Sequence, residues 1–300
     1  MDLFVRAIYI SSAFSLAYLF LLYRSNPLRR LPGTTVTLCF IVGMLGVVPV
    51  EGIHLLFPAV GGVPSMFLAA SLVEEGVKFG LMGLTIWRFP FPDLAEPIDL
   101  VIYFGALGLG FGAYEDFWYI FSSTYPAWSM GEVVRYHALF YDILIARAVP
   151  GHVLFDAIAG FLVGSARFLP GRGRMARIVG GFVVAVCLHS AYNLIAYYGG
   201  MLPLLSYVVF LVGLFIHLRR QAAARSPFND LIEFVEGRTS VWLHPRAPIE
   251  YLFADGFYWP GRPQGRMFEL FPLILSLLIL YPLFFGIIYL INVGIVGLFR

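Results

Sequence analysis

The chain is poor in charge, and above all in lysine. Only 13% of its 300 residues are charged, Lys78 is its one lysine, and 60% of the residues are hydrophobic. Long apolar runs with so few charges exclude a soluble globular domain and indicate a polytopic membrane protein. The net charge of +2 identifies no class of partner, and nothing in the sequence indicates a nucleic-acid ligand.

Cysteine is also scarce, and several familiar motifs are missing. The two cysteines, Cys39 and Cys187, both lie in apolar runs, which supports neither a disulfide framework nor a thiolate metal site. The HExxH pattern of soluble zinc proteases is absent, and no internal repeat is evident. The basic turn Gly171–Arg174 lacks the strand–turn–helix context of a phosphate-binding loop. The first apolar stretch, which ends near Tyr23, has no small-residue cleavage site, so we expect a retained helix.

The apolar runs predict an all-α transmembrane bundle of about eight spans. The bundle occupies 1–218 and is followed by a cytoplasmic polar loop or small subdomain at 219–270 and a C-terminal transmembrane helix at 271–300. The short runs at 138–149 and 201–218 are the weakest, and only the second is counted as a span. The predicted spans are 3–23, 34–58, 65–87, 99–121, 150–168, 175–197, 201–218 and 271–298.

Arginine is concentrated in alternate loops, whereas the loops near 59–64 and 198–200 contain none. The positive-inside rule then places both termini outside the cytoplasm of a cell membrane. The arginines that set this orientation are Arg24, Arg29, Arg30, Arg88, Arg167, Arg172, Arg174, Arg177, Arg219, Arg220 and Arg225.

Three charged residues lie in the middle of the third predicted span. Glu74, Glu75 and Lys78 are its only charges between Ser65 and Trp87. Spacings of four and three residues allow both carboxylates to face the ammonium on one side of a helix. Charged groups at this depth are costly and usually functional, although a buried ion pair that only joins helices is the structural alternative.

Three further spans carry polar motifs. Glu115 and Asp116 lie late in the fourth span, after a run of glycines that permits close helix packing. His152 and Asp156 are one helical turn apart, as are His189 and Asn193. Asp156 could therefore orient the His152 imidazole or share a ligand with it.

These motifs lie at matching depths. At a rise of 1.5 Å per residue, Glu74 is roughly 13 Å and His189 roughly 12 Å from the outer ends of their spans. Glu115 and Asp156 are each roughly 9 Å deep, with His152 one turn above Asp156. Antiparallel spans thus bring the polar residues to one level in the outer half of the membrane. Glu51 and His54 could extend the site or form an interfacial pair, and His137, His217 and His244 are expected to be solvated.

In this order, the motifs Glu74-Glu75-Gly-Val-Lys78, Phe111-x-x-x-Glu115, His152-x-x-x-Asp156 and His189 resemble the PrsW family of intramembrane proteases. That family is similar to the wider CAAX-prenyl-protease and Abi/CPBP group. The resemblance covers about 49–198, and Glu115 stands where CAAX proteases tend to have histidine. It implies cleavage of a peptide bond in or beside the membrane segment of a single-pass substrate in the lipid bilayer, such as an anti-sigma factor, on the extracytoplasmic side.

For such a reaction we expect Glu74 or Glu75 to be the general base, with Lys78 tuning the pair. His152 and His189 then either polarise the carbonyl directly or bind zinc with Glu115 as the third ligand, and Asp156 and Asn193 support them. The sequence leaves the metal-dependent and metal-free mechanisms open. It also leaves a proton- or ion-coupled transporter and a non-catalytic scaffold as alternatives, although a transporter usually shows inverted repeats or interrupted helices.

Overall fold

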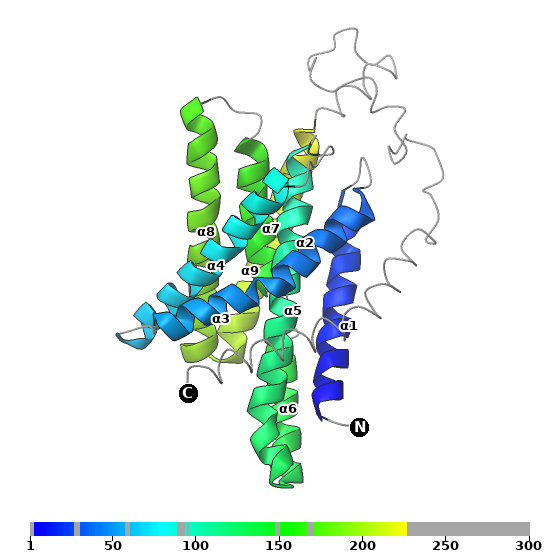
Figure 1. Cartoon of the computed structure of the whole chain (residues 1–300), viewed down its shortest axis with the longest axis vertical. Helices are drawn as coiled ribbons and strands as arrows, with labels where there is room; N and C mark the ends of the chain where they lie inside the picture. Colours follow the sequence, from blue (N-terminus) through cyan, green and yellow to red (C-terminus); the bar gives the residue numbers. More distant parts are fainter. Residues whose placement is uncertain are drawn as a thin grey trace.

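The structure is a computed structural model that describes residues 3–26, 31–57, 61–88, 94, 96–147, 151–166 and 171–226. Over these residues the chain is all-α, as predicted, with nine helices (Figure 1). The predicted span 271–298, and the predicted polar loop beyond residue 226, lie outside the described residues. The helices are α1 (Leu3–Tyr23), α2 (Gly33–Leu45), α3 (Val47–Leu56), α4 (Val63–Arg88), α5 (Pro97–Ser129), α6 (Val133–Arg147), α7 (Gly151–Ala166), α8 (Gly171–Tyr198) and α9 (Met201–Ala224).

Within the described residues, five helical segments are long and apolar enough to cross a bilayer: Leu3–Tyr23, Gly33–Leu56, Pro97–Ser129, Arg172–Tyr198 and Met201–Ala224. The chain is therefore a multi-pass membrane protein. The remaining two predicted spans are α4, which has three charges in its middle, and α7, which is apolar but only 16 residues long. That these two also cross the bilayer stays a prediction, as does the orientation of the termini.

The predicted span 34–58 is divided into two helices. α2 ends at Leu45 and α3 begins at Val47, with Gly46 between them. Pro49 has no N–H to donate to the carbonyl of Leu45, so the helical hydrogen-bond ladder is interrupted at this point. In Figure 1, α2 and α3 run obliquely across the other helices.

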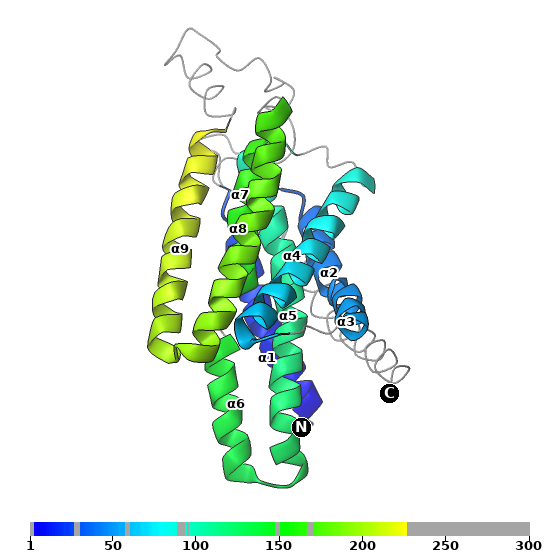
Figure 2. The same ribbon diagram turned by 90° about the vertical axis from the view of Figure 1, so that its left-hand side faces the viewer.

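The region after the fourth predicted span is also helical. α5 continues to Ser129, and α6 returns beside its last turns to form a hairpin that projects beyond the other labelled helices (Figure 2). Gly131 has a φ of +70° at the turn between them, a conformation that glycine adopts without strain. With 15 residues, α6 is shorter than a typical span, which explains why hydropathy alone did not resolve it.

α5 is the central helix, and every residue from Pro97 to Tyr114 is buried. It packs most extensively against α7, α2 and α1, whereas α4 packs mainly against α8. Small residues allow this closeness: a Cβ at Gly110 would overlap the backbone carbonyl of Phe40 in α2. The result is a tightly packed centre in which α4, α5, α7 and α8 each contribute polar side chains.

Candidate active site

The ammonium of Lys78 is fully buried at the centre of the site. Its Nζ donates hydrogen bonds to Glu75 Oε1 at 2.6 Å, on the preceding turn of α4, and to Asp156 Oδ2 of α7 at 2.8 Å. The sequence predicted that Glu74 and Glu75 could both face this ammonium; the structure shows the contact with Glu75 and adds Asp156 as a second carboxylate partner. Because buried charges are costly unless they are paired and hydrogen-bonded, this arrangement stabilises all three groups.

His189, from α8, approaches both glutamates of α4. Its Nδ1 lies 2.8 Å from Glu75 Oε1, and its Nε2 lies 3.7 Å from Glu74 Oε2. When Glu75 is ionised it can only accept, so Nδ1–H donates to it and the lone pair of a neutral His189 is on Nε2. The imidazole stacks on Phe155 with ring centroids 5.3 Å apart, which fixes the plane of the ring.

His152, from α7, lies between Lys78 and Glu115. Its Nδ1 is 3.3 Å from Lys78 Nζ, and its Nε2 is 2.8 Å from Glu115 Oε2. An ammonium has only donors, so Nδ1 accepts and Nε2–H donates to Glu115. The two imidazoles meet edge to face with centroids 4.8 Å apart. His152 and His189, which are distant in the sequence, thus lie in contact within one site.

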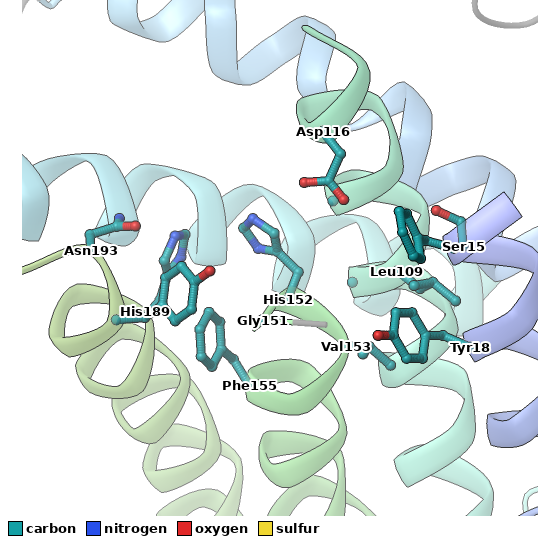
Figure 3. A pocket seen from close by; sticks show the side chains of 14 residues that line it. Ser15, Tyr18, Leu109, Asp116, Gly151, His152, Val153, Phe155, His189 and Asn193 are labelled. Atoms are coloured by element: carbon teal, nitrogen blue, oxygen red, sulfur yellow. The ribbon is translucent and has the colours of Figure 1, made fainter. Parts of the chain in front are cut away.

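A cavity of about 30 Å³ opens beside the two histidines, which is enough for a water molecule. It lies between α1, α5, α7 and α8 and is lined by polar and aromatic side chains (Figure 3). Asn193 and Asp116 are among its polar groups, and Tyr18 and Ser15 of α1 form its far side. Water can therefore be held next to both imidazoles inside the membrane-spanning part of the protein.

Two glycines of α5 make room for the face of α7 that carries His152 and Asp156. A Cβ at Gly108 would overlap Asp156 Oδ2 and would lie 2.7 Å from the carbonyl oxygen of His152. At Gly112 a Cβ would lie 3.0 Å from Cδ2 of the His152 ring. The sequence indicated these glycines only as packing residues. In the structure, the lack of a side chain at each leaves the space in which Asp156 reaches Lys78 and His152 reaches Glu115.

Replacing Gly108 with alanine should therefore displace Asp156. We expect a loss of about 1–3 kcal/mol of unfolding free energy, typical of overpacking, together with reduced activity. Gly83→Ala in α4 is the matched control, because a Cβ at that position has no neighbour within 4 Å. Denaturant titration in detergent measures the effect, and equal stability of the two variants would contradict this packing argument.

The structure brings together all the residues that the sequence selected: Glu74, Glu75, Lys78, Glu115, His152, Asp156 and His189, with Asn193 lining the adjoining cavity. Glu51 and His54 lie in α3, which packs against α4 and α5, so this helix borders the site. His137 and His217 are exposed, and His244 lies outside the described residues.

The sequence did not predict that Tyr18 and Ser15 line the cavity, because no spacing in the sequence relates α1 to the polar motifs.

Two groups of donor atoms within the described residues are compact enough for a metal ion. One consists of Glu74, His152 and His189, and the other of Glu75, His152 and Asp156, with the ligand atoms of each group within 4.8 Å of one another. Two imidazoles and a carboxylate form a known catalytic zinc set, so the first group fits such an ion. Glu115, the carboxylate expected from the sequence, belongs to neither group but contacts His152 directly.

One known protein family matches the part of the chain that contains the site. The model of the PrsW family, described as "PrsW family intramembrane metalloprotease", matches residues 31–218, which is more than half of the chain. The chain belongs to the PrsW family. It is thus an intramembrane peptidase, and the transporter and scaffold hypotheses are disfavoured.

Curated PrsW proteases are similar over part of their length. The chain is 28% identical to Protease PrsW of Geobacillus kaustophilus over 178 residues, which cover 57% of this chain and 71% of the relative. It is also 28% identical to Protease PrsW of Bacillus subtilis over 53% of this chain and 66% of that protein, and to that of Clostridioides difficile over 48% and 58%. No solved structure matches the chain.

Proposed function

We propose that this PrsW-family protein hydrolyses a peptide bond in or beside the membrane segment of a single-pass substrate, with water activated by a buried glutamate. The observation that carries the proposal is that Glu75 contacts His189 and His189 contacts His152 at one buried point, where the two histidines line a water-sized cavity. Peptide hydrolysis needs an activated water, a group that stabilises the oxyanion and a proton donor for the leaving amine.

Glu75 is the best-placed general base. Its Oε1 accepts hydrogen bonds from both Lys78 and His189, which fixes the carboxylate plane. Among the described residues, no group donates a hydrogen bond to its Oε2, so this oxygen has the capacity to take a proton from water. Glu74 lies on the other side of His189 and is the alternative or assisting base.

We expect His152 and Asn193 to interact with the carbonyl oxygen of the peptide bond that is cleaved. Both line the cavity, and the amide of Asn193 is a neutral hydrogen-bond donor there. His152 is held between Lys78 and Glu115, so its ring cannot rotate freely. The amide can donate to the carbonyl oxygen and stabilise the negative charge that develops there, and His152 can do so once its Nε2–H releases Glu115.

A divalent metal, zinc by donor type, would be held by His152, His189 and a glutamate. When bound, it supplies Lewis-acid polarisation of the carbonyl and of water. Glu74 is the carboxylate that the geometry favours, and Glu115 is the one predicted from the sequence. His152 must exchange one of its present partners, Lys78 at Nδ1 or Glu115 at Nε2, before that ring can offer a lone pair.

The metal content of two variants shows whether Glu74 or Glu115 is the carboxylate ligand. We expect Glu74→Gln to remove most of the bound metal, because it deletes a ligand. Glu115→Gln should lower the affinity only about 10–100-fold, as is usual for a group that orients a ligating histidine. Elemental analysis of washed protein across a zinc titration measures both. The reverse ranking would identify Glu115 as the ligand, and full activity without metal in strong chelator would favour the metal-free mechanism.

The location of the site within a multi-pass membrane protein supports a substrate that is itself a membrane protein. A buried centre at this depth acts on a segment that enters from the bilayer, and an anti-sigma factor cut on the extracytoplasmic side is the substrate type that the resemblance suggests. We propose a cell-membrane location with both termini outside the cytoplasm, as the arginine pattern predicts.

Reconstitution tests the activity directly. Purified protein in liposomes with a single-pass reporter should yield two fragments whose new termini, identified by mass spectrometry, lie in or next to the reporter's membrane segment. An intact reporter, or cleavage only in a soluble domain remote from the membrane, would contradict the proposal.

A further inference from the structure

The environment of Lys78 resembles that of a coordinated cation. Three acceptors from two helices surround Nζ: Glu75 Oε1 at 2.6 Å, Asp156 Oδ2 at 2.8 Å and His152 Nδ1 at 3.3 Å. The ammonium has three hydrogens, one for each acceptor. The Phe111 ring, with its centroid 5.2 Å from Nζ, closes another side. Neither Lys78 nor the two carboxylates are exposed.

The same three residues form the second of the two donor groups that are compact enough to hold a metal. The two groups are adjacent, because His152 belongs to both and Glu75 Oε1 also accepts from His189 of the first group. Two neighbouring cation positions with a shared ligand are the arrangement found in two-metal hydrolases. Here the lysine side chain extends into one of the two positions.

The charges of the centre are consistent with this view. When ionised, Glu74, Glu75, Glu115 and Asp156 would carry four negative charges, and Lys78 supplies one positive charge among them. Buried charges persist only when they are compensated. An ammonium together with one divalent ion leaves a smaller net negative charge at the centre than either cation alone.

We propose that the Lys78 ammonium permanently occupies the second cation position of a two-cation centre, so that the native protein has one metal position and loss of the ammonium opens another. The newly opened position would be formed by Glu75, Asp156 and Nδ1 of His152 and would take a divalent transition metal such as zinc. With the native metal on Nε2, His152 would then bridge the two ions as an imidazolate, its ring proton having been released to water. The proposal extends the proposed function, because the native metal position is that of the protease site. It assigns Lys78 a role different from that of a simple helix-joining ion pair.

The test is the metal stoichiometry of the purified full-length protein, measured by elemental analysis and calorimetric titration with zinc. Lys78→Met should bind one more zinc per chain than the wild type. Lys78→Arg, which keeps the positive charge, should show the wild-type number. Lys78→Met combined with Asp156→Asn, which lacks a carboxylate ligand of the new position, should lose the additional zinc.

An unchanged stoichiometry in Lys78→Met would overturn the proposal. If Lys78→Met does not fold in chelator, zinc during expression and purification should restore folding with the additional metal bound, and failure of zinc to restore it would also overturn the proposal. Lys78→Gln, which keeps a hydrogen-bond donor without the charge, should behave like Lys78→Met. The measurement does not require proteolysis, so an inactive reporter assay would contradict the proposed function without affecting this result.

Discussion

Glu75→Gln is expected to abolish proteolysis while the protein remains folded and inserted. Glutamine has the size of glutamate, and its carbonyl oxygen can still accept from Lys78 and His189 in the position of Oε1. It cannot take a proton from water, so the chemical step should lose about two to four orders of magnitude, as is typical for a missing general base. Cleavage of a membrane-anchored reporter in liposomes measures the rate.

The controls separate chemistry from folding. Glu132→Gln makes the same change at an exposed carboxylate in the α5–α6 hairpin and should leave the rate unchanged. Glu74→Gln should match Glu75→Gln if the two carboxylates share the task, and should be milder if Glu74 acts only through its contact with His189. Wild-type rates in both single variants and in the double variant would exclude the glutamate mechanism.

The second large effect is expected on stability, from Lys78→Met measured in chelator. Methionine keeps much of the volume of lysine but leaves Glu75 and Asp156 buried without their cation. Removing one partner of a buried ion pair typically costs about 3–5 kcal/mol of unfolding free energy. Denaturant titration in detergent, followed by tryptophan fluorescence, measures the loss.

Arg135→Met is the matched control. Arg135 and Glu132 also form an i,i+3 pair, but their side chains are 64% and 40% exposed. Such surface pairs contribute about 0–1 kcal/mol, because water and salt screen them. A loss of similar size in the two variants would show that burial of Lys78 does not decide its contribution.

The composition and the helical spacings predicted much of this arrangement. Glu75 and Lys78 are three residues apart on a helix, so their contact depends on local geometry alone, and the structure shows it at 2.6 Å. The sequence argument likewise expected His152 and His189 in one site, and their rings are 4.8 Å apart. By contrast, hydropathy did not predict the break at Gly46 or the helix α6, because single prolines and short helices change the average over a span very little.

Partners within the site could not be assigned from spacing. The spacing between His152 and Asp156 suggested that this carboxylate orients the histidine of its own helix or shares a ligand with it; the two residues do share Lys78 as a partner. In the structure, His152 Nε2 is bonded to Glu115 of α5, and Asp156 Oδ2 is bonded to Lys78 of α4. The rotation of each helix about its axis decides which neighbour a side chain meets, and that rotation depends on packing such as the contact of Gly108 with α7.

The sequence by itself determined the membrane class and the order of the polar motifs along successive helices, because apolar length and residue type are local properties of a helix. The tertiary structure alone decided that Lys78 is surrounded by Glu75, His152 and Asp156, that Glu74 rather than Glu115 completes a compact donor group with the two histidines, and that α1 lines the cavity. These are contacts between helices that are distant in the chain, and their partners follow from how side chains of complementary size and charge pack, which the spacing of residues within one helix does not specify.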